Sequence, residues 1–218
     1  MTALLVVAKA PVAGLAKTRL CPPATPEQAA GIAAASLLDT LDAVRATPAA
    51  RAVVALTGDV DLAARAPELR DALAAGRVLP QRGDGFPQRL ALAHADTAAA
   101  RPGAPVLQIG MDTPQVTAAL LGDACGRLAA TDAVYGPATD GGWWAIGFRD
   151  PRAAALLADI PTSRPDTGRR TLNALRGAGL RVVELPELTD VDTMPDARAV
   201  AELVPRGRFA AAVAGCPR

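Results

Sequence analysis

Short apolar runs that alternate with longer helical stretches restrict the fold of this sequence more than any other feature. The first run, "ALLVVA" at residues 3–8, is continuous and rich in Leu and Val, which is typical of a buried strand. Similar runs recur along the chain. We predict strands at 3–8, 51–58, 77–81, 104–112, twice within 132–148, and at 180–186, and helices at 26–46, 60–75, from about 86 to 100, and at 115–130, 166–179 and 194–204.

This alternation predicts an α/β fold with a mostly parallel sheet covered by helices on both faces. In such folds, ligands bind beyond the carboxyl ends of the strands. The 218 residues contain no internal repeat and no low-complexity linker, so we expect one domain over 1–204, followed by a C-terminal tail at 205–218. Aromatic residues are only 3% of the chain, so the core must be aliphatic.

Charge and cysteine content exclude several functional classes. The net charge is +1 with mixed signs, which argues against a nucleic-acid partner. The three cysteines are far apart and form no CxxC pair, which argues against a zinc site or a disulfide framework and favours the reducing cytoplasm. No run approaches the roughly 20 apolar residues of a membrane span, and no secretory signal is expected. Nothing indicates the oligomeric state.

The loop that follows the first predicted strand, "KAPVAGLAKTRL", carries three cations. Lys17 and Arg19 can donate charge-assisted hydrogen bonds to phosphate oxygens, Lys9 stands where the loop begins, and Gly14 would allow close backbone approach. The glycines of a P-loop are missing. A solvated basic loop explains the same pattern equally well.

Acidic residues follow two later segments. Asp112, in "QIGMDTP", follows a strand expected to be central, and Asp190 and Asp192, in "TDVDTMPDA", alternate as on an extended segment, so that both point to one side. Carboxylates on one face repel unless a cation lies between them, and Mg²⁺ or Mn²⁺ favours oxygen ligands. Helix capping is the alternative for Asp112 and for the segment around Asp192 and Thr193.

A glycine-rich turn lies within "GPATDGGWWAIGF". Gly141 and Gly142 indicate a backbone that another group approaches closely, although Asp140-Gly141 is also an ordinary hairpin signal. Trp143 and Trp144 face opposite ways if they lie on a strand, so one belongs to the core and the other could line an acceptor pocket.

The segment "QRGDGFPQRL" at 81–90 is a weaker candidate. Arg82 and Asp84 could contact a base or phosphate, but the segment also has the pattern of a turn with a helix cap. His94 is the only histidine, and we expect it to be a packed or surface residue. With one histidine, a Ser-His-Asp triad or a Cys-His pair is not supported.

Taken together and in this order, these segments resemble the DUF2064 family of bacterial proteins, from about residue 3 to about residue 203. Members are often labelled glycosyltransferases and are placed in the GT-A fold of nucleotide-diphospho-sugar transferases. A more distant resemblance is to phospholactate or phosphoenolpyruvate guanylyltransferases, which share the "KTRL" loop, the strand-end acid and a segment like "DVDTP". This chain departs from the guanylyltransferases in its "GPATDGGWWAIGF" segment and in Met194, which lies between Thr193 and Pro195.

The resemblance implies that Asp112, Asp190 and Asp192 bind Mg²⁺ or Mn²⁺, and that Lys17 and Arg19 contact phosphate. Our leading hypothesis is a metal-dependent glycosyltransferase-like enzyme with a nucleotide-sugar donor and a small-molecule acceptor. Lys17 would be catalytic. Asp140 would be an acceptor-side base or binding residue, in an acceptor pocket with Gly141, Gly142 and Trp143 or Trp144.

Two alternatives stay open. The first is a nucleotidyltransferase that joins an NTP to a phosphorylated small molecule and releases pyrophosphate, which the cationic loop favours somewhat. The second is a non-catalytic nucleotide-binding protein that has kept the fold.

Overall fold

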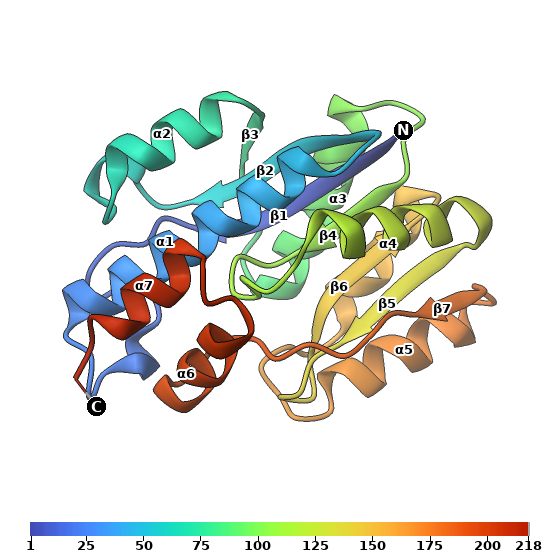
Figure 1. The fold of residues 1–218 in the computed structure, drawn as a ribbon. Coiled ribbons are helices and arrows are strands. Elements are labelled where there is room, and N and C mark those ends of the chain that lie inside the picture. Colours follow the sequence, from blue (N-terminus) through green and yellow to red (C-terminus); the bar gives the residue numbers. More distant parts are fainter. Residues whose placement is uncertain (218) are drawn as a thin grey trace.

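One seven-stranded sheet organises the computed structural model, which describes residues 1–217 (Figure 1). The strand order is β3-β2-β1-β4-β6-β5-β7. The strands are β1 (Thr2–Lys9), β2 (Ala50–Thr57), β3 (Arg77–Pro80), β4 (Val106–Ile109), β5 (Ala133–Pro137), β6 (Trp143–Phe148) and β7 (Val182–Glu184). The predicted mostly parallel α/β sheet is confirmed, because only β6 is antiparallel to its neighbours β4 and β5.

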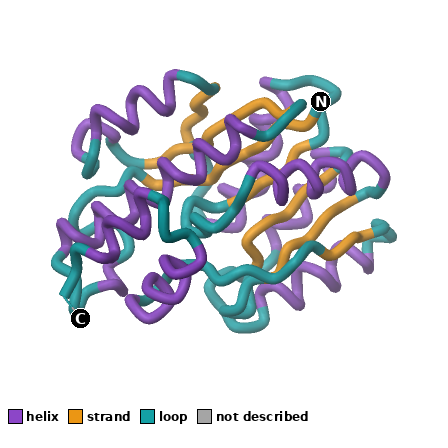
Figure 2. The backbone as a smooth tube through the Cα atoms, viewed as in Figure 1, coloured by secondary structure: helices purple, strands orange, loops and turns teal. Residues whose placement is uncertain are grey.

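Helices cover both faces of the sheet, as the path of the backbone shows (Figure 2). The α-helices are α1 (Pro26–Ala46), α2 (Ala66–Ala74), α3 (Phe86–Ala100), α4 (Ala118–Ala130), α5 (Thr167–Gly177), α6 (Met194–Leu203) and α7 (Arg208–Ala214). Three 3₁₀ helices add to them: η1 (Thr18–Leu20), η2 (Val60–Leu62) and η3 (Pro151–Asp159). None of the helices among residues 1–217 is long and apolar enough to cross a membrane.

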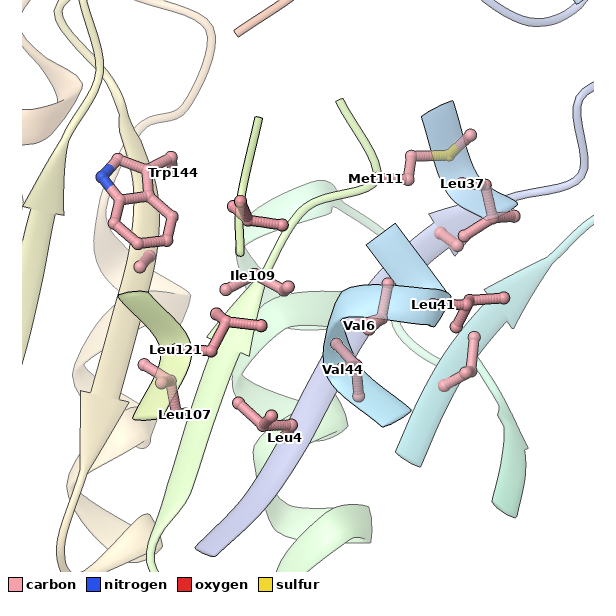
Figure 3. Packing of buried hydrophobic residues seen from close by; sticks show 14 of the residues in the cluster. Leu4, Val6, Leu37, Leu41, Val44, Leu107, Ile109, Met111, Leu121 and Trp144 are labelled. Atoms are coloured by element: carbon pink, nitrogen blue, oxygen red, sulfur yellow. The ribbon is translucent and has the colours of Figure 1, made fainter. Parts of the chain in front are cut away.

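Alternating side chains on the strands divide the core into two layers. On one face, Leu4, Val6 and Ile109 pack against α1, α2 and α4, and Figure 3 shows Leu41, Leu121 and Trp144 in this cluster. The opposite face packs against α3, η3 and α5. The core is aliphatic, as predicted, because leucine, valine, isoleucine and alanine supply nearly all of its buried side chains.

A third apolar cluster lies beside the sheet. Leu20 of η1 packs there with residues of α6 and α7, including Phe209 and Val213. The expectation of a patternless tail after residue 204 is wrong for 208–214, because the alanine-rich helix α7 closes this cluster. The domain boundary at residue 204 stays a prediction.

Two other expectations need correction. The helix predicted over 60–75 is divided into η2 and α2, because Arg65 adopts a left-handed conformation with φ of 57°. The single-strand prediction over 104–112 is too long, because β4 ends at Ile109 and leaves the following residues free to form the site. The two strands predicted within 132–148 are confirmed as the antiparallel pair β5 and β6.

His94 is a fully buried residue of α3, in agreement with the packed alternative. Its ring meets Phe148 edge-on at 5.2 Å between centroids, and neither ring nitrogen has a hydrogen-bond partner. Burial lowers the pKa of His94 to about 3, only partly opposed by the neighbouring Gln108 side chain. The folded protein therefore holds this imidazole neutral.

The free energy of unfolding should fall with acidification in a way that depends on His94. Between about pH 6.5 and pH 3 the unfolded chain binds a proton at His94 that the folded chain does not, so stability is present above this window and is lost as the pH falls through it. The slope approaches about 1.4 kcal/mol per pH unit. Urea denaturation of wild type and His94→Leu at pH 7, 5.5 and 4.5 measures it. A wild-type pH dependence equal to that of the variant would contradict the assignment.

Candidate active site

Three segments far apart in the chain meet at the carboxyl end of β4. Lys17 Nζ lies 3.0 Å from Asp112 Oδ2 and 2.9 Å from Asp192 Oδ1, and Arg19 Nη1 lies 2.8 Å from Asp192 Oδ2. Burial alone would lower the pKa of Lys17, but the charges of the two carboxylates outweigh it and raise the pKa well above its usual value. Lys17 is therefore held as a cation between two acids.

Asp190 completes a cluster of three carboxylates. One oxygen from each of Asp112, Asp190 and Asp192 lies within 4.8 Å of the other two. Burial, together with the charges of Asp140 and Asp112, raises the pKa of Asp190 to about 6. The negative charge of the three carboxylates thus exceeds the positive charge of Lys17 and Arg19 beside them.

Local structure explains why the acids converge. A Cβ on Gly110 would lie 2.4 Å from Asp112 Oδ1, so glycine lets that carboxylate fold back over the strand end. The Val191 N–H donates to Asp112 O at 2.9 Å, and this bond ties the later segment to the end of β4. Val191 is buried while Asp190 and Asp192 flank it on the other side, as the predicted alternation requires.

Threonines, not these aspartates, cap the helices that follow both acidic segments. Thr117, not Asp112, caps α4, and Thr193 caps α6 in a capping box with Asp196. Asp112 and Asp192 therefore have no capping role, and their carboxylates accept from Lys17 and Arg19 instead.

These residues border a cavity of about 710 Å³, a size suited to a nucleotide. Ten of the predicted site residues line it: Lys9, Lys17, Arg19, Asp112, Asp140, Gly142, Trp143, Trp144, Asp190 and Asp192.

Four predicted site residues do not line the cavity. Gly14 is exposed with φ of 72° and shapes the loop, Asp84 is also exposed, and Arg82 forms an ion pair with Asp96. Gly141 lies in the turn next to the cavity rather than on its wall. The turn alternative for Arg82 and Asp84 therefore agrees with the structure.

The turn between β5 and β6 brings the acceptor-side candidates to the cavity. Asp140 Oδ1 accepts from the Gly142 N–H at 2.7 Å and fixes the turn. Trp144 is the core tryptophan and donates from Nε1 to Pro186 O at 2.9 Å, whereas Trp143 is only half-buried and borders the cavity. The turn is an ordinary hairpin and also a place of close approach, since Gly168 N–H donates to Gly141 O at 2.8 Å.

Sequence reasoning missed part of the cavity wall. Gln108 on β4, Phe86, Arg89 and Leu90 on α3, and the loop around Arg164 all border it. The one available signal was the glutamine itself, a polar residue within the apolar strand "VLQI".

The strand order, the two helical layers and an acidic site at the strand ends define a protein of the nucleotide-diphospho-sugar transferase fold. The crystal structure of a candidate nucleotide-diphospho-sugar transferase from Desulfovibrio desulfuricans matches with a TM-score of 0.84 and 28% identity, over 98% of this chain and 95% of that chain. The chain also matches the family described as "Uncharacterized protein conserved in bacteria (DUF2064)" over residues 40–164, more than half its length, and it belongs to this family.

More distant structures share the fold alone. The manganese complex of Rv0371c from Mycobacterium tuberculosis matches with a TM-score of 0.57 and 23% identity, over 93% of this chain and 99% of that chain. A 4-diphosphocytidyl-2C-methyl-D-erythritol synthase matches with a TM-score of 0.61 and 14% identity, over 93% of this chain and 97% of that chain. No curated protein matches the chain in sequence.

Gly141→Ala should destabilise the turn beside the cavity. Gly141 has φ of 87°, and a Cβ there would lie 2.1 Å from Pro165 O. We expect a loss of about 2 kcal/mol or more, because a strained conformation and a backbone clash combine. Gly122→Ala, in α4 with no heavy atom within 4 Å of the new Cβ, is the control and should be neutral or stabilising. Equal melting temperatures for the two variants would refute this account of the turn.

Proposed function

We propose that this protein is a nucleotide-dependent transferase that uses a divalent metal ion and a nucleotide-sugar donor. The observation that carries the proposal is the convergence of Asp112, Asp190 and Asp192 next to the cationic loop, inside one cavity. Three oxygen ligands within 4.8 Å of one another suit a hard cation such as Mg²⁺ or Mn²⁺. Burial and the charges of Asp140 and Asp112 raise the pKa of Asp190, and a bound cation would act against both effects by favouring the charged carboxylate.

The chain's own residues have separate roles in this proposal. Lys17 and Arg19 bind the donor's phosphate oxygens and stabilise the negative charge that develops on the leaving nucleoside diphosphate. A divalent ion bound at the three aspartates would supply further positive charge at that diphosphate. The oxygen of the acceptor hydroxyl bonds to the anomeric carbon of the donor sugar while the bond from that carbon to the diphosphate breaks. Asp140 takes the proton that the hydroxyl loses.

Nucleotidyl transfer is the second candidate, and a specific observation favours it. Lys9, Lys17 and Arg19 all border the cavity, and this charge suits a triphosphate better than a diphosphate. The two reactions differ in their products. Pyrophosphate release from an NTP and a phosphorylated acceptor would identify nucleotidyl transfer, whereas release of a nucleoside diphosphate from a nucleotide sugar would identify glycosyl transfer.

Asp112→Asn should strongly weaken metal-dependent donor binding. The amide removes one ligand charge from the cluster, and we expect nucleotide affinity in Mn²⁺ to fall about 100-fold, about 2.7 kcal/mol. Isothermal titration with nucleoside diphosphates, with and without Mn²⁺, measures it. Asp123→Asn, an exposed acid of α4 paired with Arg127, is the matched control. Wild-type affinity of the Asp112 variant in Mn²⁺ would exclude the metal role.

Lys17→Met should change metal and nucleotide binding in opposite directions. The ammonium lies between Asp112 and Asp192, so its removal frees both carboxylates, and Mn²⁺ alone should bind as tightly as in wild type or a few-fold more tightly. Nucleotide affinity should fall at least about tenfold, because a charge-assisted phosphate contact is lost. The same titrations measure both constants. Parallel weakening of the two would show that Lys17 only maintains the structure of the loop.

A further inference from the structure

A buried amide borders the cavity with no partner for its oxygen. Gln108 lies in the centre of the sheet on β4, is 2% exposed, and its Oε1 accepts no hydrogen bond. Its cross-strand partners on the same face of the sheet, Leu5 of β1 and Ile146 of β6, are apolar and fully buried. An unpaired buried amide costs stability, so its presence among aliphatic side chains calls for a role.

His94 lies behind this amide. The Gln108 side chain is close enough to the imidazole to oppose the fall in the pKa of His94, although no hydrogen bond of standard geometry joins them. The neutral ring can present an N–H to Gln108 Oε1, which is shielded from solvent. Because Oε1 is shielded from solvent while the residue borders the cavity, the NH₂ group is the part of the amide that can face the cavity.

The walls around Gln108 form an apolar compartment of the cavity. Val7 of β1 borders it from the neighbouring strand, and Leu90 and Phe86 border it from α3. Phe86 is a large aromatic side chain that remains 51% exposed, although it lies at the cavity. Arg89 of α3 adds a second polar group beside Gln108. Apolar walls with an aromatic ring and a few polar groups are typical of a site for a planar heterocycle.

The position of this compartment relates it to the donor rather than to the acceptor. Val7 and Gln108 belong to β1 and β4, the strands that lead into the cationic loop and to Asp112. The acceptor-side candidates Asp140 and Trp143 come from the β5–β6 turn. A nucleotide whose phosphates contact Lys17 can therefore extend its base towards α3.

We propose that this compartment binds the base of the donor nucleotide and that Gln108 selects a base with a ring carbonyl oxygen, to which its NH₂ group donates. The shared chemistry is that of uracil, cytosine and guanine, in contrast to adenine. His94 is a positioning residue that orients the amide. The inference rests on the proposed nucleotide donor and adds the class of base to it.

Base preference and its dependence on Gln108 test the inference. Isothermal titration of UDP, CDP, GDP and ADP in Mn²⁺ gives the four affinities for wild type, Gln108→Met, Gln108→Leu and His94→Leu. Wild type should bind at least one of the three carbonyl-bearing bases about tenfold more tightly than ADP. Both Gln108 variants should bring that ratio within about twofold, because they weaken the binding of the carbonyl-bearing nucleotides. His94→Leu should lower the ratio about threefold without changing ADP affinity. If His94 had only a structural role, the variant would weaken all four nucleotides alike and leave the ratio unchanged.

Thr97→Val is the matched control. Thr97 is a buried residue of α3 that does not border the cavity, and its hydroxyl has no hydrogen-bond partner. Removal of this hydroxyl should leave the affinity ratio of the preferred nucleotide to ADP at the wild-type value.

Three results would overturn the inference. They are equal wild-type affinities for all four nucleotides, a preference for ADP, and a preference that survives in a folded Gln108 variant. The first two need no variant, so a misfolded Gln108→Met or Gln108→Leu does not remove the test. Absence of binding by all four nucleotides would instead overturn the proposed donor itself.

Discussion

The organisation of the site depends most on the ammonium of Lys17, because its two ion pairs join three parts of the chain at one point. Lys17 lies in the loop after β1, Asp112 in the loop after β4, and Asp192 before α6, yet one cation bonds to both acids. Two carboxylates this close would repel each other without it. The ammonium also borders the cavity, where an anionic ligand would compete with the two carboxylates for it.

Much of the fold was predictable because it rests on local patterns. Runs such as "ALLVVA" identify strands, and their alternation with helices predicts a sheet covered on both faces. The antiparallel direction of β6 agrees with the Asp140-Gly141 turn signal, but its insertion between β4 and β5 is a long-range pairing that no local pattern encodes. Helix α7 was missed because its alanines carry no strong period, and its packing against distant residues decides its structure.

The charged residues of the site could be predicted from local sequence, whereas the cavity wall formed by distant segments could not. Asp112, Asp190 and Asp192 were identifiable because one acid follows a strand and the other two alternate on an extended segment, which brings their carboxylates to one side. Arg82 and Asp84 were misleading, because the ion pair of Arg82 with Asp96 depends on the next helix. Gln108 is a polar residue within the apolar strand "VLQI", but this local signal does not show that the side chain borders a cavity formed with distant segments.

The third apolar cluster gives the end of the chain an influence on ligand binding at a distance. Leu20 is adjacent to Arg19 and packs in one apolar cluster with Phe209 and Val213 of α7. The packing of α7 therefore supports the loop that carries the cations. Changes in α7 can alter the stiffness of that loop without altering a single group that touches a ligand. Homologues that differ only in this helix could therefore hold the same donor with different residence times.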